Sequence, residues 1–434
     1  MNKIRLTIIL TLFAGLCTAT YGQTTIGSGK DPMKGALLDL KEYDNNNGGD
    51  TAGKGMMLPR VNLINLKPTT PSELATSIGS SGTWDLNAHI GLLVYNVKLC
   101  PAGGGIIYDE AGPQVWSGSR WQLLSLPAII EASPAETSGA NIWGTSVVKH
   151  QAKPNPAYVA GTDPAHLANT YEEFYSADFG NAGRWMATNL TAWAYDSSSI
   201  TATLDRDANA SEVDENTVTR WCYPKDAVAA DAQGWYANVI PGESAPLTWN
   251  SIQGLLYNWL AATGGENSYI GDQQMNANTT TPGPEEVETV APGGKYQGIC
   301  PKGWHLPSDR EWTNLKNTIL ANPMLYASGS PATAGTAMKH PCPLLPTLTA
   351  TNGLSKFIAS GGFAALLTGY AYKNTVRTYG QEVNFWTSSA GPATPENLAD
   401  VNALSWHVFF DKDDVFRRYN ARRFDLRSLR CKKD

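Results

Sequence analysis

One short segment, residues 298–312, constrains this chain more than any other: GICPKGWHLPSDREW. Ser308 and, three positions later, Glu311 form a capping box, in which the hydroxyl caps a backbone amide and the carboxylate reaches back to the helix start. The apolar residues that follow share one helix face until Pro323 breaks it: Trp312, Leu315 and Ile319. The segment therefore predicts a cysteine and an aromatic turn that lead into an amphipathic helix.

The chain begins with the pattern of a secretory signal peptide. Lys3 and Arg5 precede an apolar run over 6–14, and small and polar residues follow. This run is too short to span a bilayer and no later run is long enough, so we expect residues 1–22 to be removed and the rest to stay out of the membrane. The alternative, a lipid anchor on Cys17, lacks the usual small residue before it. We expect a secreted protein or one at the extracellular face of the outer membrane.

Export permits disulfides, and the cysteine positions suggest which ones form. No C-x-x-C pair is present and the histidines are scattered, so the sequence predicts no zinc cluster and no metal site. Beyond the signal peptide, Cys100 stands alone, while the other four cysteines lie in the C-terminal part. We predict the pairs Cys300–Cys431 and Cys222–Cys342. Cys100 is then left over, either as a thiol or as a cross-link between chains.

Composition narrows the class of protein further. Of 434 residues, 42% are apolar and only 17% are charged, with 41 Gly, 26 Pro and 14 Trp, which suits a loop-rich extracellular protein with β-structure. The net charge of −6 gives no basic surface, so we expect no nucleic-acid partner. Arginines gather only near the C-terminus, where a solvated strand face is their expected setting: Arg417, Arg418, Arg422, Arg423, Arg427 and Arg430.

Residues 23–125 are expected to form a β-rich first domain. Short strands are predicted at 92–95 and on both sides of a turn at 117–119, between Trp116 and Trp121. The motifs ALLDL, GMMLPRV, GLLVYN and WSGSRW resemble the N-terminal module of many exported Bacteroidetes surface proteins. The resemblance implies a surface or stalk module, and self-assembly through this module is a further expectation.

The rest of the chain divides into a linker and a C-terminal domain. Prolines scattered over 126–175 are expected to break any regular element. In the domain that follows, 176–434, apolar spacing over 252–260 predicts an amphipathic helix ended by Gly264 and Gly265. Its last part predicts a hairpin turn at 411–414 and four strands, at 384–389, 406–410, 415–419 and 426–431.

The C-terminal domain carries a series of motifs: GRWMATNL, WCYPKD, GLLYNW, residues 298–312, GGFAAL, FWTSS and the final LRCKKD. In this order they resemble the Fibrobacter succinogenes major paralogous domain. Two features depart from that family's pattern. The usual Gly-Phe before the last strand is replaced by Leu426 and Arg427. The second cysteine that usually follows the Cys-Tyr motif is absent, which leaves the partner of Cys222 open.

This family is similar in turn to the C-type-lectin-like and formylglycine-generating-enzyme fold. The resemblance implies an α+β protein whose larger part is a C-type-lectin-like domain, with a twisted antiparallel sheet, two helices, long loops and paired chain ends. The smaller β-rich domain precedes it.

No residue pattern predicts catalysis. His305 is expected to make structural hydrogen bonds, and Ser388 and Ser389 lack the G-x-S-x-G elbow of a nucleophile. The copper-binding cysteine pair of the formylglycine-generating enzyme has no counterpart, since only Cys431 lies near the chain end. The three-histidine iron site of related enzymes has none either, and the acidic run 411–414 lacks the spacing of a calcium loop. We therefore predict a protein that is not an enzyme and has no cofactor.

The function expected from this fold is non-enzymatic adhesion or ligand recognition, with a glycan or a surface protein as the ligand. The candidate surface consists of loops at 264–295, 328–350 and 370–382. Aromatic side chains stack on sugars, so the candidate ligand-binding residues are aromatics outside the regular motifs: Trp235, Tyr236, Tyr269, Tyr370, Tyr372 and Tyr379. Two alternatives stay open, a structural subunit of a surface appendage or fibre, and an extracellular enzyme acting on polysaccharide or peptide.

Overall fold

The structure is a computed structural model that describes most of the C-terminal half and parts of the N-terminal half. The described residues are 24–26, 37–42, 55–97, 112–124, 130–131, 147–155, 158–161, 168–197, 200, 204–206, 218–224, 236–237, 249–264, 296–328, 333–344, 352–372, 375–390 and 402–434. The chain divides into two compact units, residues 1–59 and 60–434. Helices and many short strands occur together, so the predicted α+β class is confirmed.

The described strands of the first unit form one short pair. Strand β1 (Thr24–Ile26) lies parallel to β2 (Leu38–Leu40). Leu38 and Leu40 are exposed. A two-stranded pair is marginal on its own in water, so these strands lack a core of their own within the described residues.

Residues 60–124 contain a four-stranded sheet of order β3-β4-β5-β6. Helix α2 (Pro71–Ser77) accompanies it and begins with a capping box. The predicted turn at 117–119 joins β5 to β6, and the fully buried Trp116 and Trp121 pair across it. The strand and the hairpin predicted here are therefore confirmed. The strands are β3 (Arg60–Val61), β4 (Leu93–Asn96), β5 (Gly112–Trp116) and β6 (Trp121–Leu123).

A six-stranded sheet of order β17-β23-β12-β11-β8-β7 draws its strands from distant parts of the sequence. Strand β8 lies inside the predicted linker, yet it pairs with β11 and buries Val147 and Val148. The expectation of no regular element over 126–175 is wrong, because Val147–His150 contains no proline, and Pro154 itself lies in the two-residue strand β9 (Lys153–Pro154). The strands are β7 (Ile130–Glu131), β8 (Val147–His150), β11 (Phe174–Asp178), β12 (Arg184–Met186), β17 (Trp304–His305) and β23 (Lys432–Lys433).

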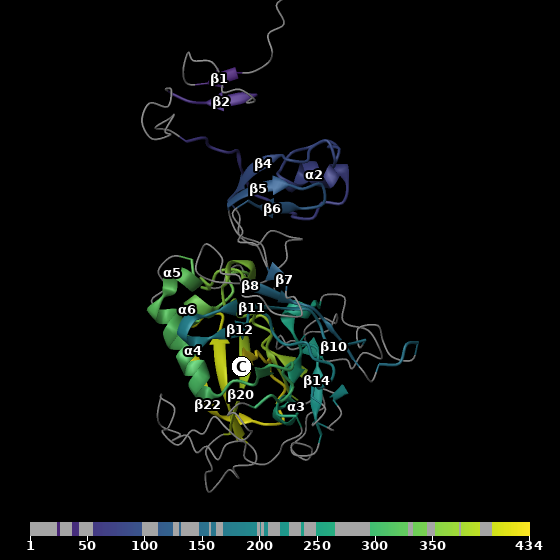
Figure 1. The fold of residues 1–434 in the computed structure, drawn as a ribbon, viewed down its shortest axis with the longest axis vertical. Helices are drawn as coiled ribbons and strands as arrows, with labels where there is room; N and C mark the ends of the chain where they lie inside the picture. The colour runs from purple at the N-terminus through teal and green to yellow at the C-terminus, as the bar shows by residue number, and fades with distance from the viewer. Residues whose placement is uncertain are drawn as a thin grey trace, which may run out of the picture. The chain divides into compact units, whose positions relative to one another are not determined.

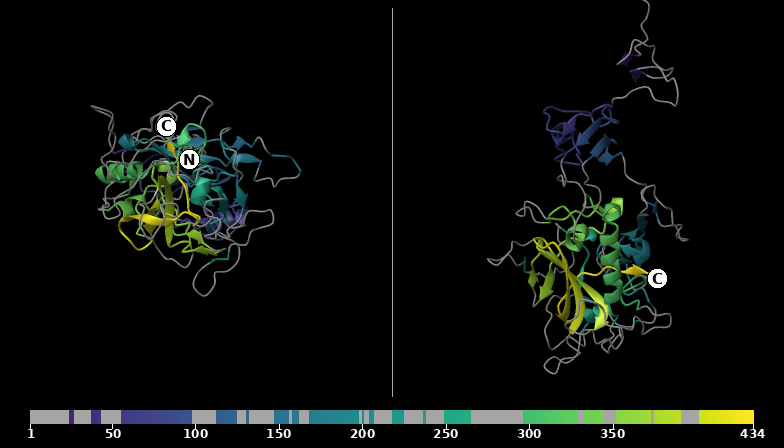
Figure 2. Two further views of the ribbon diagram at one scale, coloured as in Figure 1. Left: turned by 90° about the horizontal axis from the view of Figure 1, so that it is seen from below. Right: turned by 90° about the vertical axis from the view of Figure 1, so that its left-hand side faces the viewer.

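The longest strands form an antiparallel sheet of order β20-β21-β22, whose twist is visible in Figure 2. Helix α4 (Asp309–Ala321) starts at the predicted capping box and lies along one face of this sheet (Figure 1). Trp312 of the helix stacks on Phe385 and Trp406 of the sheet. The predicted hairpin turn joins the last two of the strands, which are β20 (Glu382–Ala390), β21 (Asn402–Phe409) and β22 (Val415–Arg422).

The remaining elements are short, and their strands form three small sheets, β10-β9, β13-β14-β16 and β15-β19-β18. They are β9 (Lys153–Pro154), β10 (Asn169–Tyr171), η2 (Gly180–Ala182), β13 (Asp205–Arg206), β14 (Arg220–Cys222), β15 (Tyr236–Ala237), η3 (Ser251–Gln253), β16 (Leu256–Tyr257), α3 (Trp259–Ala262), α5 (Pro323–Tyr326), α6 (Ala334–Met338), η4 (Ile358–Ser360), β18 (Tyr370–Tyr372) and β19 (Thr375–Arg377).

Two predicted elements differ from the structure. The helix predicted over 252–260 is wrong, since this stretch forms η3, β16 and the first part of α3. Its residues from Leu255 to Leu260 are all buried. The spacing of apolar residues predicts an amphipathic helix only where the opposite face is exposed to solvent, so it does not apply to this segment. The strand predicted at 426–431 is reduced to single bridges at 426–428, and the regular strand β23 follows it.

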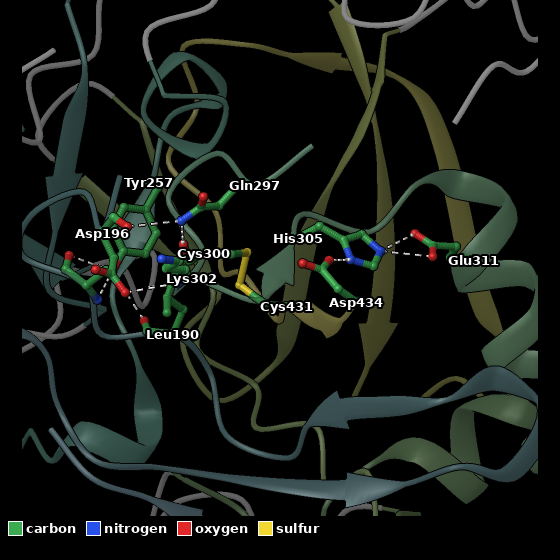
Figure 3. Close-up of a disulfide and its surroundings, with 11 residues drawn as sticks. Leu190, Asp196, Tyr257, Gln297, Cys300, Lys302, His305, Glu311, Cys431 and Asp434 are labelled. Carbon is green, nitrogen blue, oxygen red and sulfur yellow. Dashed lines mark hydrogen bonds and ion pairs between the residues drawn. A yellow bond between two sulfur atoms is a disulfide. The ribbon is translucent and has the colours of Figure 1, made fainter. Parts of the chain in front are cut away.

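Cys300 and Cys431 form the predicted disulfide, with Cα atoms 5.9 Å apart (Figure 3). Near it, His305 lies between two carboxylates, with Nδ1 2.8 Å from Asp434 Oδ1 and Nε2 2.9 Å from Glu311 Oε1. Burial acts to raise the pKa of Glu311, but the His305 hydrogen bond and a lysine ammonium outweigh it and hold this pKa at about 2. His305 therefore ties the start of α4 to residue 434, which is the structural role expected for it.

The predicted Cys222–Cys342 disulfide is wrong. Cys342 is disulfide-bonded, whereas Cys222 is a buried thiol on β14. Cys222 belongs to an apolar cluster with Leu256 and Val376, a setting that suits a small buried thiol. Cys100 lies outside the described residues.

The C-terminal arginines do not share one solvated face, so that expectation is wrong. Arg430 is fully buried, where its Nε donates to Asn189 Oδ1 and its Nη2 to Ala364 O. Burial lowers the pKa of Arg430 to about 9. Arg417 forms an ion pair with the buried Asp309, with Nε 2.7 Å from Oδ2. The chain turns into the core after β22, which buries Arg423, Arg427 and Arg430 and leaves Arg418 and Arg422 exposed.

Candidate functional site

A pocket of about 300 Å³ lies beside the sheet β20-β21-β22. Four arginines and two carboxylates lie among its lining residues, and few apolar side chains do. Pockets for small molecules are usually lined by apolar residues, so this one suits a polar ligand. The lining residues are Tyr370, Tyr372, Arg377, Glu382, Asn384, His407, Arg418, Asn420, Ala421, Arg422, Asp425 and Arg427.

Strand alternation places polar side chains on the pocket side of the sheet. On β20, Val383 and Phe385 belong to the apolar core that also contains residues of α4, whereas Glu382 and Asn384 line the pocket. His407 of β21 is paired with Asn384 and also lines the pocket. The same strands therefore build an apolar face and a polar face, both largely buried.

The buried lining residues form the floor of the pocket: Glu382, Asn384, His407, Ala421, Asp425 and Arg427. The Nε2 of His407 lies 3.0 Å from Arg427 Nη1 and 2.8 Å from Ser405 Oγ, and its Nδ1 lies 3.9 Å from Glu382 Oε2. Burial, together with the charges of Arg427 and Arg418, holds the pKa of His407 well below its usual value. The ring is therefore neutral, and because Arg427 donates to Nε2, we assign the ring proton to Nδ1.

Arg427 is held by a carboxylate and two aromatic rings. Its Nη2 donates to Asp425 Oδ2 at 2.8 Å, and its guanidinium carbon lies 4.8 Å from the ring centroid of Trp386 and 5.6 Å from that of Tyr370. Burial raises the pKa of Asp425, and the charge of Arg427 opposes this shift. The two charges compensate each other within the floor.

The rim carries positive charge. Arg418 and Arg422 on β22 are exposed, and neither makes an ion pair with another described residue. Arg377 and Arg422 lie 4.7 and 5.9 Å from the ring centroid of Tyr372. A cation–π contact orients a guanidinium without neutralising its charge. The rim is therefore suited to an anionic group.

Asn384 in the floor is 1% exposed, yet neither atom of its side-chain amide has a hydrogen-bond partner among the described residues. The same holds for His407 Nδ1 and Arg427 Nε. Buried polar groups are nearly always hydrogen-bonded, and leaving one without a partner costs about 1–3 kcal/mol. Several such groups lie at this pocket, where a water or a bound molecule has room to satisfy them.

Ser405, His407 and Glu382 follow one another in the order of a hydrolase relay. Ser405 is, however, fully buried and does not line the pocket. Arg427 also donates to the histidine nitrogen that would have to accept the serine proton. A substrate in the pocket cannot reach this hydroxyl in the observed arrangement. Only Ser405 and His407 share a hydrogen bond, since Glu382 lies 3.9 Å from the ring nitrogen.

The structure separates the six aromatic residues predicted to bind a ligand. Tyr370 and Tyr372 line the pocket. Tyr379 lies instead in the core, where it is 2% exposed and donates its hydroxyl to Gln253 Oε1 at 3.0 Å. Trp235 and Tyr269 lie outside the described residues, and Tyr236 is described only as backbone in β15.

The polar lining itself was missed by sequence reasoning. One signal was the alternation in β20, where Glu382 and Asn384 interrupt an apolar pattern. A second was the departure from the pattern of the similar family, since Arg427 replaces one of its usual residues and lies in the pocket. Neither signal indicates that these polar residues line a common pocket.

No group of three or more His, Cys, Asp or Glu side chains in the described part of the chain could hold a metal ion. No described helix combines the length and the apolar character needed to cross a membrane. The acidic turn at 411–414 is exposed and joins two strands.

Comparison with known proteins supplies a family. The model of the Fibrobacter succinogenes major domain matches residues 180–431, which include the disulfide and every residue that lines the pocket. No curated protein and no solved structure matches the chain.

Proposed function

The chain belongs to the Fibrobacter succinogenes major domain family, and we propose that it is an exported, non-enzymatic surface protein that recognises a ligand in the pocket beside β20-β21-β22. The observation that carries this proposal is the side-chain amide of Asn384, buried in the floor without a partner. A chain that keeps an unpaired amide there gives up stability, which a bound ligand would restore. The charged rim supplies the means to orient that ligand.

The setting of the domain is part of the proposal. We propose a C-type-lectin-like architecture, supported by the order of its motifs, and an extracellular location, supported by the signal-peptide pattern and by the disulfide. Self-assembly through the N-terminal part is supported by the exposed Leu38 and Leu40 of its small strand pair. Size-exclusion chromatography of the exported chain with and without reductant tests this assembly, and a monomer in both conditions contradicts it.

The decisive experiment is a glycan-array and surface-protein binding screen of the exported chain, with and without EDTA. We expect selective binding that survives EDTA and is lost in Asn384→Leu. The matched control is Asn322→Leu, an exposed asparagine at the end of α4, which should bind as the unaltered chain does. Binding that is equal in both variants would place recognition elsewhere, and binding lost with EDTA would require a bound cation.

A hydrolase is the second candidate, favoured by the 2.8 Å contact between Ser405 Oγ and His407 Nε2. Labelling with a fluorophosphonate probe separates the two candidates. We expect no covalent label, because Ser405 is buried away from the pocket. A label that disappears in Ser405→Ala would replace our proposal with an acyl-transfer enzyme.

A further inference from the structure

The chemistry of the pocket narrows the ligand to one class. We infer that it binds an acidic sugar, whose carboxylate or sulfate is held by Arg377, Arg418 and Arg422 at the rim and whose hydroxyl groups are held by Asn384 and the carboxylates of the floor. This inference rests on the proposed function, since it specifies the ligand of the same pocket.

The charge distribution requires an anion at the rim. Of the four lining arginines, Arg427 is paired with Asp425 at 2.8 Å, whereas the exposed Arg418 and Arg422 make no ion pair with another described residue. A guanidinium offers a planar fork of donors that matches the oxygens of a carboxylate or a sulfate. A cationic ligand would meet these arginines before it reached the acidic groups of the floor.

The floor requires hydroxyl groups as well. Glu382 and Asp425 are 7% and 6% exposed, and a carboxylate only accepts hydrogen bonds, so these two groups need donors on the ligand. The amide of Asn384 offers both a donor and an acceptor without a partner. Sugar hydroxyls donate and accept at once, so a sugar can satisfy these groups together.

The scarcity of apolar lining excludes the main alternatives. Lipids and hydrophobic peptides need apolar walls, but Ala421, Tyr370 and Tyr372 are the lining residues with an apolar or aromatic side chain, apart from His407. Guanidinium groups already lie near both tyrosine rings, at 5.6 Å for Tyr370 and 4.7 Å for Tyr372. Recognition therefore depends on hydrogen bonds and charge.

The test is isothermal titration calorimetry of the exported chain with a short oligogalacturonate, a sulfated galactose oligomer, the neutral galactose oligomer, and sodium acetate and sulfate alone. We expect one of the two acidic oligomers to bind at least about 10-fold more tightly than the neutral one, with an affinity that falls as salt rises. Which acidic oligomer binds identifies the anionic group.

Substitutions of the exposed arginines test whether the acidic group binds at the rim of the pocket. Arg418→Gln and Arg422→Gln should each weaken acidic binding by about 10-fold and leave the weak neutral binding unchanged, since a charge-assisted contact is lost. Both residues are exposed, so the fold should persist. Arg60→Gln is the matched control, an exposed arginine on β3 that should bind normally.

Each contrary result has its own meaning. Equal binding of neutral and acidic oligomers, or acetate or sulfate binding as tightly as the oligomers, would overturn the acidic-sugar inference. If a neutral glycan or a protein binds instead and Asn384→Leu abolishes that binding, the inference falls and the proposed function stands. If no ligand in the titrations or in the screen depends on Asn384, both fall.

Discussion

The two faces of the sheet β20-β21-β22 consist of the same strands but differ in chemistry, since one is apolar and the other is polar. On the face toward α4, Phe385 stacks on Trp312, and the buried Asp309 is paired with Arg417 and accepts from a tryptophan ring. On the other face, Asn384 and His407 have buried polar atoms that no described residue satisfies. Buried polar atoms without a hydrogen-bond partner in the described part of the chain occur on both faces, Trp312 Nε1 among them on the first, but aromatic packing dominates only that first face. Neighbouring residues of one strand should therefore respond oppositely to substitution.

The largest effect is expected on the apolar face. Phe385→Ala should lower the free energy of unfolding by about 3–5 kcal/mol, because it removes a fully buried ring from the core around Trp312. Chemical denaturation of the disulfide-bonded chain, followed by tryptophan fluorescence, measures this loss. A loss below about 1 kcal/mol would mean that the helix–sheet contact contributes little, and the contrast between the faces would disappear.

The next effect compares two adjacent arginines. Arg417→Gln should cost about 3 kcal/mol, because it removes the partner of a buried carboxylate. Burial raises the pKa of Asp309 and Arg417 opposes this shift, so the variant should also lose its deficit as acid protonates the carboxyl. The matched control is Arg418→Gln on the pocket side, which should change stability by no more than about 0.5 kcal/mol. An equal loss in the free energy of unfolding for the two variants would show that the face on which a β22 residue lies does not determine its contribution to stability.

A substitution on the polar face should raise the free energy of unfolding instead of lowering it. Asn384→Leu keeps a similar volume and removes a buried amide without partners, so we expect a gain of about 1 kcal/mol in the free energy of unfolding. The same variant should lose ligand binding. Thermal denaturation measured without ligand checks the gain, and a clear loss of stability would indicate that the amide is satisfied in solution, for instance by ordered water.

The smallest effect is the response to acid. His407 stays neutral in the fold, whereas an imidazole in the unfolded chain takes up a proton below about pH 6.5. The unfolded state then binds more protons, so the free energy of unfolding should fall as the pH drops below about 6.5 and should not depend on this residue above it. His150, whose pKa burial lowers to about 4, acts in the same direction between those values. A His407→Asn variant should show a shallower decline, and an unchanged slope would contradict the assignment.

Local rules were sufficient where a few neighbouring residues determine the structure. Ser308 and Glu311 satisfy each other within one turn, so the start of α4 could be read from the sequence. The pairing of Cys300 with Cys431 was also predicted correctly, whereas Cys222 and Cys342 lay in the same part of the chain and do not pair. Position along the chain is thus a weak guide to contacts between its distant parts.

The site depended on information that local patterns lack. Arg418 and Arg430 belong to the same basic stretch, but the turn of the chain after β22 leaves the first exposed and buries the second. Tyr372 and Tyr379 were equally plausible ligand contacts, and only packing places one in the pocket and the other in the core. Which polar residues share a pocket is decided by the three-dimensional arrangement of five strands.

The disulfide gives the pocket a mechanical property. Every residue that lines the pocket lies between positions 370 and 427, inside the covalent ring that Cys300 and Cys431 close with a sequence separation of 131. Tension applied through a captured ligand would enter this ring and leave through the chain before Cys300. The force would be divided between two segments, the chain from Cys300 to the pocket and the chain from the pocket to Cys431. The disulfide joins these two segments again. For the surface role proposed above, a force on a bound ligand would therefore not unfold the pocket from the distant end of the chain.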